Sequence, residues 1–204
     1  GNTMIQTSKD IIKHVKNKNI EIEPFDDKKV GPNSYDVTLS NKIKLYKKSN
    51  IVIDEDGNKI LKVNHNSNGF NNFKGFLDIK ERLDFYEIII PEEGLVIPNN
   101  ELILGSTNEY AGSSKFIPMY EGVSSTGRVG LASHVTAGFG DIGFKGKWTL
   151  EIFSIYPIKI YPNMRIGQVF FYMPSSVDEN SLYNGKYQSQ SEVMESHIHK
   201  DFKN

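Results

Sequence analysis

Short segments with the alternation of β-strands recur from residue 35 to residue 172, and this recurrence limits the fold more than any other feature. In these segments apolar side chains alternate with polar ones or form a short apolar run, as half-buried and buried strands do. Residues that favour turns, above all Asn, Gly and Pro, separate the segments. We predict strands at residues 35–39, 42–46, 85–90, 102–107, 148–153, 158–161 and 168–172. The pattern predicts a mainly β fold, a sandwich or a jelly-roll-like barrel.

One helix is predicted ahead of the strands, over residues 8–17. Thr7 stands at the position of an N-cap, and Asp10 places a carboxylate in the first turn. Ile11, Ile12 and Val15 recur at helical spacing, so we expect these three side chains to form the buried face of the helix.

No composition shift or repeat divides the 204 residues, which predicts a single domain over residues 1–204. Residues 1–3 precede Met4 and are interpreted as an expression scar. Residues 50–76 are rich in Asn, Lys and Gly, and they predict a surface insertion or a long hairpin. Residues 174–204 form a polar tail whose composition alone is typical of disorder.

Composition excludes several classes of function. The chain has 24 basic and 25 acidic residues, a balance that argues against a protein that binds nucleic acid or a membrane surface. It has no cysteine, which excludes disulfides, Cys-based zinc sites and Cys nucleophiles. It also excludes the zinc nucleobase deaminases, whose metal needs Cys ligands. No apolar run reaches the length of a membrane span and no secretory signal is visible, so we expect a cytoplasmic protein.

Glu151 is a candidate base within the predicted strand at residues 148–153. Alternation places its carboxylate on the face opposite Leu150 and Ile152, beside Thr149 and Phe153. Partial desolvation there would raise a carboxylate pKa and favour proton transfer near neutral pH. A glutamate on the wet face of a strand is the commoner meaning of this segment taken alone.

Two glycine-rich runs precede that strand. The first, EGVSSTGRVG at residues 121–130, carries Ser124, Ser125 and Arg128 among three glycines, which indicates close backbone approach or positive φ. The second, HVTAGFGDIGFKG at residues 134–146, places Asp141 where a carboxylate could meet a ribose hydroxyl or a metal-bound water. An Asx-type turn with Gly143 is the simpler interpretation of that second run.

Taken together, these runs resemble the dCTP deaminase branch of the dUTPase superfamily, including its bifunctional deaminase–diphosphatase type. The family pattern has two serines and an arginine, then H-V-T-A-G with a later Asp, then a strand that carries L-E. Further similar segments are GPNSYDVTL at residues 31–39, LGSTNE at 104–109, PIKIYPNMRIGQ at 157–168 and KYQSQ at 186–190. The resemblance covers most of the chain, with residues 50–76 the clear exception. It implies a distorted jelly-roll β-barrel of the dUTPase type with one N-terminal helix.

The resemblance also implies a catalytic group. Glu151 would act as general base on the water that attacks C4 of a cytosine deoxynucleotide, most plainly dCTP. Ser124 and a backbone carbonyl near Ala137 would hold this water, and Arg128 would orient the group. The substrate-binding residues it implies are Ser125, Thr136, Ala137, Asp141, Lys186, Tyr187 and Gln190. Asp141 would contact the sugar, and the tail residues would close over the phosphates.

The implied cofactor is Mg²⁺ that enters bound to the substrate triphosphate, with no catalytic metal held by the protein and no zinc. The implied partners are a deoxycytidine or deoxyuridine nucleotide and two further copies of the chain, in a homotrimer with shared active sites. No nucleic acid and no membrane is expected as a partner.

Two other functions remain open. The first is a diphosphatase for dUTP or a related nucleotide, in which Asp141 activates water, alone or after deamination. The second is a non-catalytic nucleotide sensor. Val123 stands where the family has a phosphate-binding Arg, and with only three arginines in the chain the replacing cation would be Lys186. Asn163 replaces a turn glycine, and Asn tolerates the left-handed conformation that such a turn needs.

Overall fold

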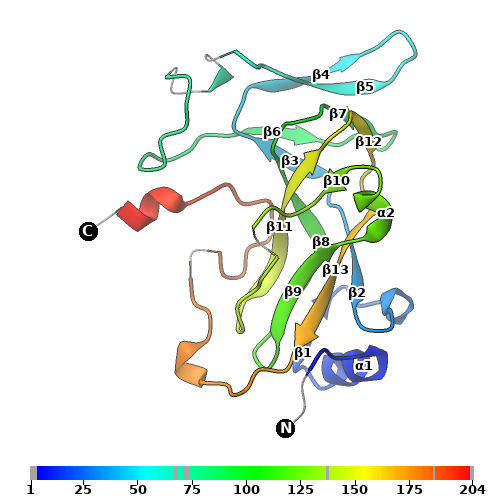
Figure 1. Cartoon of the computed structure of the whole chain (residues 1–204), viewed down its shortest axis with the longest axis vertical. Helices are drawn as coiled ribbons and strands as arrows, with labels where there is room; N and C mark the ends of the chain where they lie inside the picture. Colours follow the sequence, from blue (N-terminus) through cyan, green and yellow to red (C-terminus); the bar gives the residue numbers. More distant parts are fainter. Residues whose placement is uncertain (1–3, 67–68, 71–73, 137, 186, 203–204) are drawn as a thin grey trace.

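The structure, a computed structural model, describes residues 4–66, 69–70, 74–136, 138–185 and 187–202 (Figure 1). Strands dominate it and two α-helices accompany them. In chain order the elements are α1 (Ser8–Lys16), β1 (Ile20–Glu23), β2 (Tyr35–Thr38), β3 (Lys42–Leu45), β4 (Ser49–Ile53), β5 (Lys59–Val63), β6 (Tyr86–Ile89), β7 (Leu95–Ile97), β8 (Ile103–Ser113), β9 (Ile117–Gly122), α2 (Ser124–Gly127), β10 (Leu131–Ala132), β11 (Lys145–Ser154), β12 (Ile158–Ile160) and β13 (Arg165–Tyr172). The predicted mainly β fold with an N-terminal helix is confirmed.

The largest sheet has the strand order β10-β11-β8-β3-β6, and β1 pairs with the far end of β8. The two long strands β8 and β11 run antiparallel, with Glu151 opposite Leu104 and Thr149 opposite Ser106. Their register shifts between Lys147 and Thr149, as at a β-bulge. At this shift the Trp148 N–H donates to the Thr107 hydroxyl at 2.9 Å instead of to the opposite backbone.

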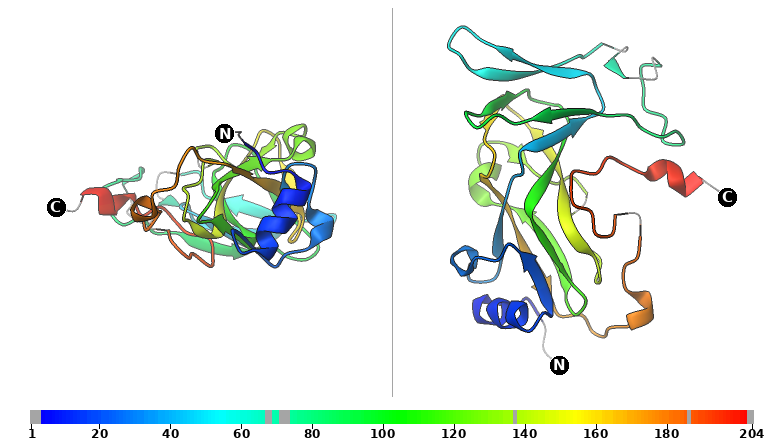
Figure 2. Two further views of the ribbon diagram at one scale, coloured as in Figure 1. Left: turned by 90° about the horizontal axis from the view of Figure 1, so that it is seen from below. Right: turned by 180° about the vertical axis from the view of Figure 1, so that it is seen from behind.

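Two smaller sheets pack around this one, with orders β12-β7-β5-β4 and β2-β13-β9. The three sheets remain separate and enclose a core without closing into one continuous barrel (Figure 2). The largest fully buried side chains of this core include Tyr35, Phe116, Tyr120 and Phe171. The turn before β13 has Asn163 at φ 65°, as the sequence predicted, and its side-chain oxygen accepts from the Asn108 amide at 2.9 Å.

The N-terminal helix begins where the sequence predicts, but two details differ. The Thr7 hydroxyl donates to the Asp10 carboxylate at 3.2 Å and does not accept a backbone N–H, so Thr7 is not a side-chain cap. Ile11 is fully buried and Val15 packs on the core, whereas Ile12 is 41% exposed. The prediction that Ile12 faces the core is wrong. The face of α1 that packs on the core is a narrow stripe that includes Ile11 and Val15, and Ile12 lies outside it.

The tail runs back along β11 and ends in a short 3-10 helix, η4 (Ile198–Phe202), drawn in red in Figure 1. The Lys147 N–H donates to the Gln190 carbonyl at 2.9 Å, and the Ser189 N–H donates to the Lys145 carbonyl at 3.0 Å. Val193 is almost fully buried beneath this segment. Packing against β11 thus orders a segment whose composition alone suggests disorder. No helix in the described residues is long and apolar enough to span a membrane.

Candidate active site

Glu151 lies near the carboxyl end of β11, on the face that the tail follows. The burial of this strand alternates strictly, with Leu150 and Ile152 buried and Glu151 half-buried. This alternation confirms the predicted facing of Glu151, away from its two apolar neighbours.

The loop after β10 bends over Glu151 and donates to it. Glu151 Oε1 accepts the N–H of Val135 at 2.9 Å and the N–H of Thr136 at 3.0 Å. The Glu151 N–H in turn donates to the Ser133 carbonyl at 3.0 Å. Two adjacent backbone donors therefore fix the carboxylate in one orientation. Thr136, a predicted substrate-binding residue, lies beside the predicted base, while Ala137 is outside the described residues.

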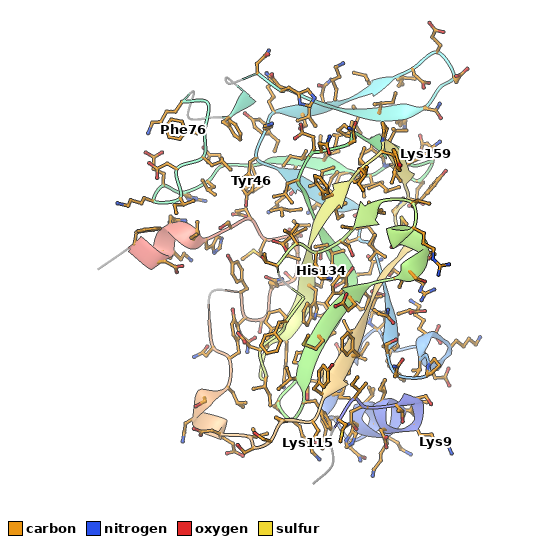
Figure 3. The ribbon with its side chains drawn as sticks, viewed as in Figure 1. Lys9, Tyr46, Phe76, Lys115, His134 and Lys159 are labelled. Carbon is orange, nitrogen blue, oxygen red and sulfur yellow. The ribbon has the colours of Figure 1, made fainter. Side chains whose placement is uncertain are left out.

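Tyr120 and Ser133 support this loop from below, and sequence reasoning missed both. The Tyr120 hydroxyl lies 2.6 Å from the Ser133 hydroxyl, and the Tyr120 ring meets the His134 ring edge-on at 5.7 Å. Burial raises the pKa of the Tyr120 phenol well above its usual range, although the Ser133 bond opposes this shift. Tyr120 therefore stays a neutral hydroxyl. His134 (labelled in Figure 3) also lies 3.3 Å from Glu121 through Nε2.

Ser124, Ser125 and Arg128 lie together at α2, on the exposed surface. Within the described residues, the guanidinium of Arg128 makes no hydrogen bond or ion pair. Among the described residues, no hydrogen bond or ion pair joins Ser124 or Arg128 to Glu151. Val123 precedes α2 and its side chain is buried, so this position serves packing in the single chain.

Of the three glycines in residues 121–130, only Gly130 has a conformation that favours glycine. Gly130 has φ 83°, and a Cβ there would lie 3.2 Å from Ile155. Nothing lies within 4 Å of a Cβ added at Gly127, and its φ is not positive. Neither the available space nor the backbone conformation therefore requires glycine at this position.

Asp141 is exposed and begins a turn whose Phe144 N–H donates to the Asp141 carbonyl at 3.1 Å. Gly143 has φ 95° in this turn, as predicted, but the backbone carbonyl of Asp141 closes the turn and its side chain does not, so the predicted Asx-type turn is wrong. The Asp141 side chain makes no hydrogen bond or ion pair with the residues that the structure describes.

Thr149, two residues before Glu151 on the same face, anchors the tail. Its hydroxyl oxygen accepts the Gln190 side-chain amide at 3.2 Å and the Met194 N–H at 3.2 Å. The same Gln190 amide also donates to the Lys147 carbonyl. The structure therefore uses the Gln190 amide to hold the tail on β11. Its predicted role over the phosphates stays a prediction.

The other predicted tail residues lie further along this segment. Tyr187 accepts the His197 N–H at its hydroxyl at 3.1 Å, and the two rings stack with centroids 5.6 Å apart. Lys186 is outside the described residues. Tyr187 and His197 thus pack on each other and form a wall of stacked rings within the tail.

Tyr46, which sequence reasoning also missed, joins this wall to β3. Its hydroxyl accepts the Ser196 N–H at 2.8 Å. Burial raises the pKa of the Tyr46 phenol, and the nearby Tyr187, Glu195 and Glu151 add to this shift. Tyr46 therefore lies close both to the candidate base and to the last part of the tail. Over the part of the chain described, no three His, Asp or Glu side chains gather as metal ligands.

Comparisons with known proteins agree with one family. A family model described as dCTP deaminase-like matches residues 5–173. A protein named dCTP deaminase, dUMP-forming, from Clostridium botulinum (strain Eklund 17B / Type B) is 44% identical over 201 residues, which cover 98% of this chain and 99% of the relative. Proteins of the same name from Cytophaga hutchinsonii and Leptospira biflexa are 41% and 36% identical, over 94% and 98% of this chain and 95% and 98% of theirs.

A solved structure supports the same fold. The crystal structure of 2'-deoxycytidine 5'-triphosphate deaminase from Agrobacterium tumefaciens matches with a TM-score of 0.57 at 18% identity. The match covers 85% of this chain and 49% of that chain.

Proposed function

Because this chain belongs to the dCTP deaminase-like family, we propose that it removes the amino group of dCTP by hydrolysis. Water adds to C4 of the cytosine ring, and ammonia leaves with the amino nitrogen. The product ring is uracil. The relatives at 36–44% identity carry this activity in their names and match this chain over nearly its whole length.

Glu151 is the proposed general base, and its fixed orientation carries this assignment. A general base must lie within hydrogen-bond reach of the proton that it takes. The N–H groups of Val135 and Thr136 hold Oε1, so the carboxylate keeps one orientation while substrate binds. It takes a proton from the attacking water and passes it to N3 or to the departing amine.

We propose that a second subunit completes the site. Ser124 and Arg128 would hold the water and orient the base, yet in one chain they lie apart from Glu151 on exposed α2. Around them Val129, Ile155 and Tyr156 are 52%, 59% and 63% exposed, and the Ile155 N–H donates to the Gly130 carbonyl, so these side chains form one apolar surface. An exposed apolar surface of this kind supports a subunit interface. In the proposed homotrimer, α2 of one subunit meets Glu151 of the next.

The relatives' name, dUMP-forming, supports a second hydrolysis at the phosphates. In this proposal dCTP and two waters give dUMP, ammonia and pyrophosphate. Asp141 contacts the sugar or activates the second water, and Mg²⁺ enters with the triphosphate and neutralises its charge. Ser125, Thr136, Tyr187 and Gln190 bind the nucleotide. A nucleotide substrate of this kind supports a cytoplasmic location.

One assay separates the proposed activities. Purified protein with Mg²⁺ is given dCTP, dCMP, dUTP or dATP, and ammonia, dUMP and pyrophosphate are measured separately. We expect ammonia, dUMP and pyrophosphate from dCTP. Pyrophosphate from dUTP without any ammonia from dCTP would favour a diphosphatase alone, and nucleotide binding without products would favour a sensor.

A mixing experiment tests the shared site. Chains with Glu151→Gln and chains with Arg128→Ala are each expected to be inactive as pure oligomers. Co-expressed, they form mixed oligomers in which some interfaces pair an intact Glu151 with an intact Arg128. Ammonia release is therefore expected to return. Continued inactivity of well-folded mixed oligomers would place both residues in a site within one subunit.

A further inference from the structure

A cleft of about 420 Å³ opens between the end of the tail and the loop before β6. The lining side chains come from these two segments and are Arg82, Leu83, Glu195, Ser196, His197, His199 and Lys200. Lys80 of the loop lies over the Phe202 ring of η4 at 5.6 Å, so the two segments are in contact beside the cleft. Figures 1 and 3 show η4 below this loop, and Figure 3 labels Tyr46.

The cleft contains more positive than negative charge. Arg82 and Lys200 are exposed and form no ion pair with the residues described. Glu195 is the one acidic residue among its lining residues, and Lys44 neutralises it at 3.2 Å, with both side chains nearly buried. In the loop itself, Glu81 is paired with Lys74 at 2.9 Å. The guanidinium and the ammonium are therefore available to a ligand.

His197 also lines the cleft. Its Nδ1 is buried and has no hydrogen-bond partner within the described residues, and its Nε2 lies 3.7 Å from Glu195. The ring itself is fixed by stacking on Tyr187.

We propose that this cleft binds a phosphate or diphosphate group. Arg presents a planar fork that meets two phosphate oxygens at once, and Lys supplies a compact charge beside it. The volume lies within the range of roughly 300–1,000 Å³ that is typical of small-molecule sites. None of the lining residues belongs to the predicted catalytic or substrate-binding set. The phosphate group can come from free pyrophosphate or from the phosphates of a bound nucleotide.

Binding to the full chain tests this site without any turnover. Pyrophosphate and inorganic phosphate are titrated by calorimetry into the wild type, into Arg82→Gln/Lys200→Gln, and into the matched control Lys9→Gln/Lys28→Gln. The control removes two exposed charges of α1 and η1 (Asp27–Lys29), far from the tail in sequence. We expect pyrophosphate to bind the wild type and the control equally, and the double variant about tenfold or more weakly.

Equal affinity of both double variants, or no binding to the wild type, would overturn the proposal. Thermal unfolding of each variant shows whether a loss of binding reflects a loss of folding. A second titration in Glu151→Gln with saturating dCTP distinguishes the two sources. Displacement of pyrophosphate assigns the cleft to the nucleotide's phosphates, and simultaneous binding assigns it to a free anion. Ammonia release is measured separately, so failure here leaves the deaminase proposal standing.

Discussion

Backbone N–H groups orient the carboxylate of Glu151. The groups that hold the side chain are therefore different from the group that would transfer the proton. Val135 and Thr136 donate to the same oxygen. A side-chain amide has an oxygen at the same place, so it can accept both bonds. Substitution of the carboxylate by an amide therefore tests chemistry with little change in structure.

We predict that Glu151→Gln lowers the rate of ammonia release from dCTP by at least about 100-fold, because an amide cannot take a proton from water. Thermal unfolding and nucleotide affinity are expected to stay near the wild type. Steady-state kinetics and calorimetry measure these effects, with Glu92→Gln on an exposed turn as the control. A rate within a few-fold of the wild type would rule out Glu151 as the base.

The sequence predicts the facing of Glu151 but not what holds it. Strand alternation fixes which face a side chain takes, and that prediction is confirmed by the burial of Leu150 and Ile152. The donors to Glu151 are backbone groups, and every residue except proline carries the same one. The residue types of Val135 and Thr136 therefore do not mark them as donors to Glu151. In the same way, the sequence does not show that Tyr46 contacts the tail.

At the scale of elements, the tail depends on β11 for its order. The tail donates two hydrogen bonds to the Thr149 hydroxyl, one from the Gln190 side chain and one from the Met194 N–H. The buried pair of Lys44 and Glu195 holds the next part of the tail to β3. Glu151 shares the face of Thr149, so the docked tail lies on the same face of β11 as the candidate base.

We predict that Thr149→Val loosens the tail, because it leaves the Met194 N–H without its acceptor, at a cost of about 1 kcal/mol. Hydrogen exchange of residues 188–202 should speed up severalfold while the core strands keep their protection. Thr149→Ser retains the hydroxyl and should behave as the wild type. Unchanged exchange in Thr149→Val would mean that the tail is held without Thr149.

Tail docking should also weaken in acid. Burial alone would raise the pKa of Glu195, but hydrogen bonds from its own backbone N–H and from Lys44 outweigh burial, and the pKa falls below 4.5. A carboxylate with a lowered pKa stabilises the docked tail at any pH above its pKa in the undocked state. This stabilisation is lost as the pH falls through its pKa in the docked state. Protection of the tail should therefore decline as the pH drops below 4.5.

Glu195→Gln serves as the comparison for that acid effect. Its tail should be less protected at neutral pH and should show a weaker change with acid. If the wild type and Glu195→Gln decline in parallel, the ionisation of Glu195 does not control docking.

The long strands are predicted from sequence better than the short ones. Residues 148–153 are correctly placed in β11, whereas β7 has three residues and offers no periodicity to detect. β9 contains Pro118, which argues against a strand, but β9 is the last strand of its sheet and can accept a proline. β8 continues past the predicted end at Thr107 to Ser113, because pairing with β1 and β11 overrides the Asn and Gly within it.

At the scale of the whole molecule, the single chain separates residues that the proposed chemistry needs together. Arg128 and Ser124 lie on exposed α2, and the apolar surface of Val129, Ile155 and Tyr156 adjoins them. Such a separation lies beyond sequence patterns, which report what each segment does and not which copy of the chain it meets.

We predict that the protein is a trimer by light scattering and that Tyr156→Glu shifts it towards monomers. A charge placed on a desolvated apolar surface opposes association strongly. Ammonia release should fall with the loss of trimers, while the monomer keeps its β-sheet signal in circular dichroism. Ile12→Glu, on exposed α1, should leave the trimer intact. A wild-type monomer with full activity would contradict the shared site.

The tail contacts join residues that are far apart in the chain: Lys44 with Glu195 and Tyr46 with Ser196, separated by 151 and 150 positions. During synthesis the N-terminal part of a chain folds first, so the central sheet can form while the tail is still on the ribosome. Until the tail docks, Thr149 lacks its hydrogen bonds from Gln190 and Met194, and Lys44 lacks its bond to Glu195. The last residues to be translated complete the wall beside the candidate base, which ties the maturation of the site to the end of translation.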